Sequence, residues 1–297
     1  MMIVDSFFVM ALLAAELDIE VRQPVDEQKA AQIVEWIEST AQNISLVYGR
    51  FPNPDAKIIV IPAGDNRWGG DSPVIYGQVT RHRGETVELF INPDRPIEEF
   101  YSDWTATHEF SHLMLPLLNL RYRWISEGMA TYYQNILLSR AGHYTPEFAW
   151  QRLSEGFERG RKSSPELSPN DAAANGIRNS RMKVYWSGAA FALLADIELR
   201  ERSGGAESLD TVLDQLQACC LPARQKWSGP RLFEKLDSFV ESPVFMPLYR
   251  RYGDSDGFPE LAPVLDRLGV EVNADGTVSL DDDASLSAIR KAISARQ

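Results

Sequence analysis

Histidine, cysteine and long apolar segments are all scarce in this chain. Its 297 residues include four histidines and two cysteines, which are too few thiols for a zinc site built on cysteine. No segment has the roughly 20 consecutive apolar residues that a bilayer-spanning helix requires, so no integral membrane span is expected. The two cysteines are neighbours, Cys219 and Cys220. Adjacent residues rarely meet disulfide geometry, and we therefore expect two small buried thiols.

Positive charge is also in short supply. Thirty Lys and Arg residues stand against 42 Asp and Glu, which leaves a formal net charge of −12. A nucleic-acid partner requires a cationic face for its phosphates, so this composition argues against one. The hydrophobic fraction of 44% is ample for a sizeable core and excludes an intrinsically disordered chain.

The N-terminal segment, residues 1–15, is the one strongly apolar terminal run. Its part from Phe7 to Ala15 has the length of a signal-peptide apolar region and ends in small residues. Asp5 and the lack of a preceding Lys or Arg argue against a signal peptide. Two interpretations stay open: a signal peptide of a periplasmic or secreted protein, or a buried N-terminal segment of a cytoplasmic one.

Hydropathy periodicity predicts an α+β fold with a β-rich front and a helical back. Residues 17–22, 57–62, 74–79 and 86–91 read as strands of an antiparallel-leaning sheet, and a helix is expected over about 26–48. From residue 97 onward helices dominate, starting with one over 97–115 and a second over 124–140. Residues 163–180 read as a surface loop. We therefore expect a β-rich subdomain over 16–96, a helical one over 97–202 and a C-terminal helical one over 203–297.

Two of the four histidines stand four residues apart in the motif His108-Glu109-Phe110-Ser111-His112. On an α-helix, residues i and i+4 project from the same face, so both imidazoles can reach one metal ion. Glu109 lies a little further round the helix, where it can act as general base on a water that the metal activates. The alternative is a pair of histidines on an ordinary helix face.

A third ligand is required, because catalytic zinc normally takes three protein ligands. Glu127 follows His112 within the segment Trp124–Tyr133. Pro116 stops the first helix, so a second helix that starts near Trp124 can pack antiparallel to it and present Glu127 to the ion. Glu127 can equally be a helix N-terminal charge stabilised by the helix dipole, and the two roles do not exclude each other.

These motifs resemble those of the gluzincin metallopeptidases, in which a Glu on a downstream helix is the third zinc ligand. The pattern Trp-x-x-Glu-Gly-x-Ala-x-Tyr-Tyr over residues 124–133 is most similar to the glycyl-aminopeptidase-like, or peptidase MA-like, branch. The resemblance implies a zincin-like fold and one Zn²⁺ per chain held by His108, His112 and Glu127.

The resemblance extends to Tyr185-Trp-Ser-Gly188, which corresponds to a Tyr-x-Lys-Gly element of related gluzincins. It implies that Tyr185 donates a hydrogen bond to the oxyanion of the tetrahedral intermediate. The alternative is an aromatic packed in the core. Ser187 departs from the pattern, since it occupies the position of the usual lysine. The chain also lacks the Gly-x-Met-Glu-Asn element with which large aminopeptidases hold the substrate amino group.

The sequence therefore predicts a zinc metallopeptidase that acts on a peptide or protein substrate, with exopeptidase and endopeptidase activity both open. Its rival is a non-catalytic protein that uses a metallopeptidase-like fold for binding or scaffolding. Two further observations stay open: Asp103 is a candidate partner for an imidazole, and Tyr132 and Tyr133 either line the cleft or pack in the core.

Overall fold

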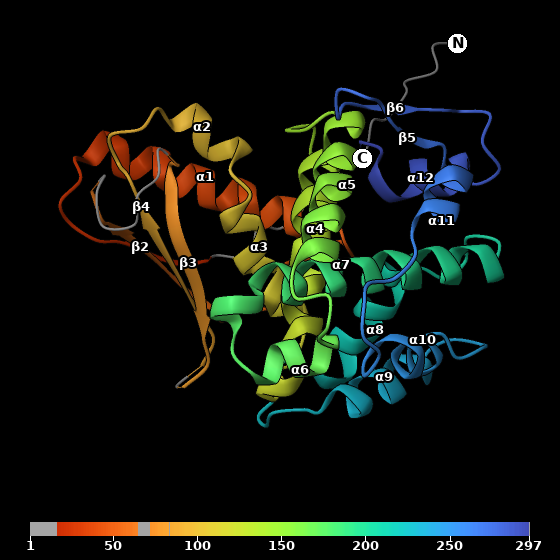
Figure 1. Ribbon diagram of the computed structural model, residues 1–297. Coiled ribbons are helices and arrows are strands. Elements are labelled where there is room, and N and C mark those ends of the chain that lie inside the picture. The colour runs from red at the N-terminus through yellow and green to blue at the C-terminus, as the bar shows by residue number, and fades with distance from the viewer. Residues whose placement is uncertain (1–16, 65–71, 83, 297) are drawn as a thin grey trace, which may run out of the picture.

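The computed structural model describes residues 17–64, 72–82 and 84–296. The apolar segment 1–15 lies outside the described residues, and so do the two interpretations of it. The fold class is confirmed as α+β, with a small mixed sheet on one side and helices on the other (Figure 1). In the described part, no helix is both long enough and apolar enough to cross a membrane. The boundaries expected near residues 96 and 202 stay predictions.

A four-stranded sheet forms the front of the molecule. Its strands, in spatial order, are β1 (Asp18–Val21), β2 (Lys57–Pro62), β4 (Thr86–Ile91) and β3 (Val74–Thr80). The expected hairpin is present, because β3 and β4 pair antiparallel. The expectation of an antiparallel-leaning sheet was wrong, since β1 with β2 and β2 with β4 are parallel. Helix α1 (Glu27–Ser45) lies between β1 and β2 in the chain and returns it to the same end of the sheet, which makes that pair parallel.

Helix α1 covers one face of the sheet with an apolar stripe. Asp26 caps its start by accepting the N–H of Lys29 at 2.7 Å. Ile33, Ile37 and Ile44 are fully buried, as are the sheet residues that alternate toward the same core. The other end strand of the sheet, β3, lies on the side where the helical part of the chain begins.

The single helix expected over 97–115 is broken into three pieces. They are α2 (Ile97–Ser102), α3 (Thr105–Ser111) and the 3-10 turn η1 (His112–Met114). Asp103 has extended backbone and accepts the N–H of Thr105 at 2.8 Å, so it ends one helix and caps the next. The two motif histidines consequently occupy the last turn of α3 and the first residue of η1.

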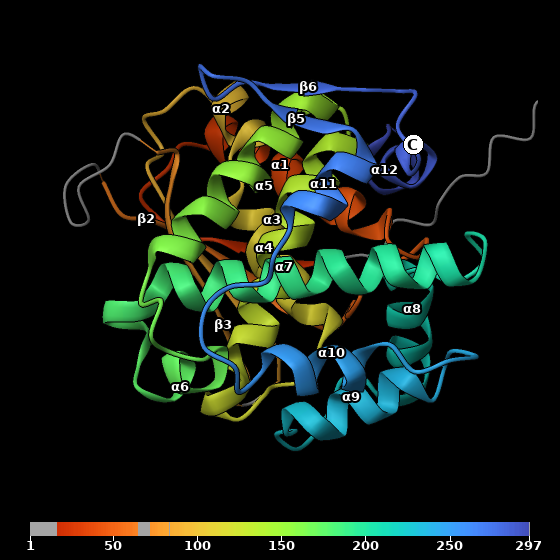
Figure 2. The ribbon, with the colours of Figure 1, turned by 45° about the vertical axis from the view of Figure 1, so that its right-hand side comes forward.

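Two long helices form the centre of the helical region. They are α4 (Arg123–Arg140), which follows the 3-10 turn η2 (Leu120–Tyr122), and α7 (Ile177–Arg202). Figure 2 shows α7 running across the molecule, with α5 (Pro146–Lys162) on one side and the helices between residues 209 and 252 on the other. The surface loop expected over 163–180 was wrong in part, because it contains α6 (Pro169–Ala174). Ser168 caps α6, and Asn170 is fully buried and accepts the indole N–H of Trp124.

The C-terminal region adds five helices and a β-hairpin. They are α8 (Leu209–Cys220), α9 (Gly229–Asp237), α10 (Phe245–Tyr252), α11 (Ala262–Leu268), β5 (Val270–Val272), β6 (Val278–Leu280) and α12 (Ser287–Ser294). The expectation of two buried thiols was wrong: Cys219 is exposed, Cys220 is half-buried, and a disulfide joins them. The buried face of α8 ends at Leu216, so its last turn lies outside the core.

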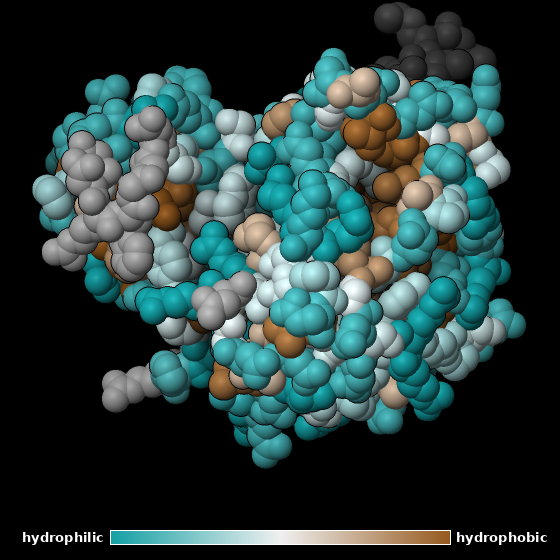
Figure 3. Space-filling model, viewed as in Figure 1, coloured by the Kyte–Doolittle hydropathy of each residue, from teal (hydrophilic) through white to brown (hydrophobic). Residues whose placement is uncertain are grey.

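An apolar hollow separates α5 from the C-terminal segment. Figure 3 shows brown side chains gathered there, and the cavity has a volume of about 450 Å³. Phe157, Phe258 and Leu265 contribute to its lining, with Glu155 and Arg161. None of the predicted site residues lines this hollow.

Candidate metal centre

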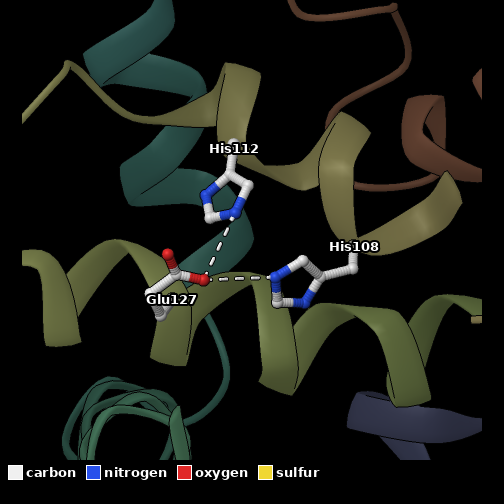
Figure 4. Close-up of side chains that lie close together, drawn as sticks. All are labelled: His108, His112 and Glu127. Atoms are coloured by element: carbon white, nitrogen blue, oxygen red, sulfur yellow. Dashed lines mark hydrogen bonds and ion pairs between the residues drawn. The ribbon is translucent and has the colours of Figure 1, made fainter. Parts of the chain in front are cut away.

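Three of the predicted site residues converge on one point. The ligand atoms of His108, His112 and Glu127 all lie within 4.8 Å of one another. Figure 4 shows both imidazoles turned toward the same carboxylate oxygen, Glu127 Oε2, which is 3.4 Å from His108 Nε2 and 3.6 Å from His112 Nε2. The two histidines come from α3 and η1, and Glu127 comes from the second turn of α4.

Each imidazole is held in place through its other ring nitrogen. The Nδ1 of His108 lies 2.8 Å from Gln134 Oε1, and the Nδ1 of His112 lies 2.9 Å from Ser126 Oγ. Because the amide oxygen of Gln134 can only accept, Nδ1 of His108 donates to it, and Nε2 of the same ring faces Glu127. Such partners fix the tautomer and the ring orientation of a metal-binding histidine.

The arrangement fits zinc in donor chemistry and in spacing. Two imidazole nitrogens and one carboxylate are a ligand set of catalytic zinc sites, which leave a fourth position open. Ligands about 2.0–2.1 Å from a tetrahedral ion stand about 3.4 Å apart, and the two nitrogen-to-oxygen distances in the structure are close to that value. The separations of Glu127 from both imidazoles are therefore those that a tetrahedral ion would impose, and the two histidine ligand atoms lie within 4.8 Å of each other.

Charge around the three ligands is unbalanced. Burial alone would raise the pKa of Glu127, but the neighbouring imidazoles outweigh it and hold that pKa below its usual range. Among the described residues, the only ion-pair partners of Glu127 are His108 and His112, and Glu109 has none. The site thus contains two carboxylates and no Lys or Arg paired with either of them.

Glu109 lies beside the ligands in a cramped position. It is 8% exposed, and burial raises its pKa, although the two imidazoles oppose that effect. A Cβ atom built on Gly77 would lie 2.5 Å from Glu109 Cγ. The backbone of β3 therefore contacts the side chain of Glu109 directly, which only glycine permits at this position.

Tyr185, on α7, joins this group through its contact with His108. Its ring stacks on the imidazole of His108, with 5.7 Å between ring centroids and an interplanar angle of 10°. Burial first, and then the charges of Glu127 and Glu109, raise the pKa of its phenol, so Tyr185 stays protonated at neutral pH and can donate a hydrogen bond.

A close crossing of α4 and α7 brings Tyr185 to this position. A Cβ atom on Gly128 would lie 2.1 Å from Gly188 Cα, and one on Gly188 would lie 2.0 Å from the carbonyl oxygen of Trp124. The two helices therefore meet backbone to backbone. Glu127 and Tyr185 flank this crossing, which explains the glycines in both sequence motifs.

Two candidates from the sequence have other roles. Asp103 caps α3 and accepts a bond from Ser72 at 2.7 Å, and no hydrogen bond joins it to either histidine. Tyr132 and Tyr133 are fully buried and donate to Asp196 and Asp210, so they pack in the core.

The partners of the two imidazoles, Gln134 and Ser126, were not predicted from the sequence. Gln134 lies seven residues after Glu127, which is two helical turns and the same helix face, so its position could have been predicted. Ser126 is the neighbour of Glu127 but gave no signal of its own. Gly77 was visible only as a glycine in a strand, which marks a close approach without identifying what approaches.

Comparison with known proteins gives one family match and several solved structures of similar fold. A family model described as M61 glycyl aminopeptidase matches residues 118–190, which include Glu127, Tyr185 and both glycines of the crossing. No curated protein matches the chain at a significant level.

Solved structures of similar fold include an aminopeptidase N family protein from Idiomarina loihiensis, with a TM-score of 0.63 and 14% identity. Another is a two-domain M1 zinc metallopeptidase variant bound to L-arginine, with a TM-score of 0.52 and 12% identity. A third is an M1 zinc metallopeptidase variant from Deinococcus radiodurans bound to a Tyr-Ser-Ala substrate, with a TM-score of 0.51 and 14% identity.

These structures cover 86%, 81% and 80% of this chain, which spans only 47%, 48% and 46% of theirs. The chain thus matches about half the length of each structure. At these identities the likeness shows the fold, which is similar to that of M1 zinc aminopeptidases. Together with the family match, it supports a relationship to zinc metallopeptidases.

Proposed function

We propose that this protein is a zinc-dependent peptidase, with His108, His112 and Glu127 as the zinc ligands. The observation that carries the proposal is a buried carboxylate, Glu109, and a partly buried one, Glu127, beside two imidazole nitrogens that face Glu127. Burying two negative charges without a paired cation is costly, and a divalent cation bound at the three ligand atoms would offset that cost. The M61 family match and the M1 fold likeness support the same proposal.

Zinc bound at this site would act as a Lewis acid toward a water and a substrate carbonyl. Glu109 would take the proton of the attacking water, because it follows the ligand His108 directly in α3 and its side chain is buried against Gly77 of β3. Its buried carboxylate has a raised pKa, which suits a group that accepts a proton and then delivers it to the leaving amine.

Tyr185 and β3 would contact the substrate. The protonated phenol of Tyr185 can donate to the oxyanion that forms during attack, which stabilises the transition state more than the ground state. Strand β3 is the end strand of the sheet and contacts Glu109 through Gly77. An extended peptide that paired with β3 would therefore lie beside the metal.

The rival is a non-catalytic protein with a metal held for structure. Glu109 argues against it, because a structural site is normally closed by a fourth protein ligand and has no need of a buried base. The choice between an exopeptidase and an endopeptidase is left to experiment.

Metal analysis and a peptide screen test the proposal together. The purified protein should contain about one zinc per chain, and it should cleave members of a mixed peptide library unless a chelator is present. The cleavage position then separates exopeptidase from endopeptidase activity. A protein that takes up no zinc would overturn the metal site, and a zinc-loaded protein that cleaves nothing would favour the binding role.

A further inference from the structure

Arg81 lies just after the end of β3. In the structure its side chain is only 11% exposed. Its Nη2 donates to the carbonyl oxygen of His112 at 2.7 Å and to that of Leu115 at 3.1 Å. The guanidinium therefore contacts the backbone of a proposed zinc ligand.

The two carbonyls belong to the end of the metal-binding helix. α3 ends at Ser111 and η1 ends at Met114, so this last turn lacks the N–H donors of a continuing helix, and the carbonyl of His112 accepts a backbone bond from Leu115 at 3.2 Å. A positive charge at a helix C-terminus is also favourable toward the helix dipole. Arg81 thus caps the helix at the turn that presents His112.

A carboxylate and an amide hold Arg81 in this orientation. Its Nε donates to Glu85 Oε1 at 2.6 Å, and Glu85 Oε2 accepts a bond from Asn53 at 2.8 Å. The side chain of Glu85 is also largely buried, at 10% exposed. A buried guanidinium with a fixed carboxylate and two carbonyls has little freedom to move.

Gly77 provides a second contact between the same two elements. Side chains alternate along a strand, so residues 77, 79 and 81 share one face. Gly77 contacts Glu109 on that face, and Arg81 contacts the carbonyls of His112 and Leu115. β3 is thus joined to the metal-binding helix at two points, next to the base and next to a ligand.

We propose that Arg81 is a positioning residue of the zinc site, which holds His112 in register with β3. The inference rests on the proposed function, because it takes His112 as a zinc ligand and β3 as the substrate-binding strand. Without the cap, the last turn that carries His112 would shift relative to both Glu127 and β3. Zinc affinity and the rate of the chemical step should then fall together.

The chain offers a matched control in Arg290. Arg290 is also buried and paired with a carboxylate, Asp282, and it donates to the carbonyls of Leu268 at the end of α11, of Gly269 just after it and of Asp281 just after β6. In the C-terminal region it therefore has the same structural role, that of a buried guanidinium that holds a carboxylate and backbone carbonyls. Arg81→Met and Arg290→Met should destabilise the fold to a similar degree, while only the first should affect zinc.

The experiment measures zinc affinity by competition with a chromophoric chelator, together with kcat and KM on a cleaved peptide. Arg81→Met should bind zinc about tenfold more weakly and lose about tenfold in kcat with little change in KM. Arg81→Lys, which keeps the charge and one donor, should recover part of both losses. Arg290→Met should match the wild type in both.

Three outcomes separate the two hypotheses. A wild type that binds zinc and cleaves peptides, with an Arg81→Met variant that differs from Arg290→Met in affinity and kcat, supports the inference. Equal zinc affinity and equal kcat in the two variants would overturn the inference and leave the proposed function intact. A wild type that takes up no zinc would overturn the proposed function itself.

Discussion

Helices α4 and α7 carry two buried charged clusters of opposite character. Near the start of α4, Glu127 lies with Glu109, two histidines and Tyr185. Further along the same helices lies the paired cluster, which comprises Tyr132, Tyr133 and Arg140 from α4, Asp196 and Arg200 from α7, and Asp210 from α8. The paired cluster contains two arginines and two aspartates, so its formal charges cancel.

The difference between the clusters lies in how their charges are satisfied. In the paired cluster, Arg140 lies 2.9 Å from Asp210 and Arg200 lies 2.9 Å from Asp196, and each tyrosine donates to one of the two aspartates. In the metal cluster, Glu127 faces two imidazoles, and among the described residues neither Glu127 nor Glu109 has a Lys or Arg partner. Burial with balanced charge is structural, whereas burial with excess negative charge indicates a place for a cation.

Removing the imidazoles should have the largest effect. His108→Ala with His112→Ala leaves a single ligand, so we expect zinc binding and peptidase activity to be lost. Zinc at about 1,000 times its dissociation constant should stabilise the wild type by about 4 kcal/mol and the double variant by nothing. Thermal unfolding with and without zinc measures this, and a double variant that zinc still stabilises would contradict the ligand assignment.

Glu109→Gln should separate zinc binding from the catalytic step. The amide has nearly the same shape, so it should keep the contact with Gly77 and leave zinc content unchanged. Because it cannot accept the proton, kcat should fall by about 10²–10⁴-fold. Metal analysis and steady-state kinetics check both parts. A variant that keeps its activity would remove Glu109 from the mechanism.

Asp210→Ala should destabilise the paired cluster without touching zinc. It leaves Arg140 buried without its carboxylate partner, which should cost about 3–5 kcal/mol in unfolding free energy. Urea unfolding measures the loss, and metal analysis should still find the wild-type zinc content. Glu158→Gln, which breaks an exposed ion pair with Arg161, is the control and should barely change stability.

Tyr185→Phe should have the smallest of these effects and the most specific one. Loss of an oxyanion donor should lower kcat by about 10²-fold and leave KM nearly unchanged. Tyr132→Phe removes the same hydroxyl from the paired cluster and should affect stability only. If the two variants had the same kcat, Tyr185 would be a packing residue.

Spacing along helices made most of the metal cluster predictable from the sequence. His108 and His112 are one turn apart, and the short return after Pro116 allowed Glu127 to be placed on an adjacent helix. The structure brings all three together. Gln134 follows the same helical spacing, so its position could also have been predicted.

Contacts between segments that are distant in the chain could not be predicted from the sequence. The distance from β3 to α3 depends on how the sheet packs on the helices, so neither the contact of Gly77 with Glu109 nor the cap formed by Arg81 could be derived from local pattern. The parallel pairing of β1 and β2 likewise depends on the path of α1. Asp103 was assigned from proximity in sequence, but its short side chain bonds the backbone two residues on.

The glycine crossing of α4 and α7 has a consequence for how the protein can evolve. Because Gly128 and Gly188 place the two backbones in contact, the separation between Glu127 and Tyr185 does not depend on the size of any side chain between the helices. Core residues elsewhere on α4 and α7 can therefore change volume without altering the distance between the metal and the oxyanion donor. The same contact gives the site no tolerance at the two glycines, where even an added methyl group would force the helices apart.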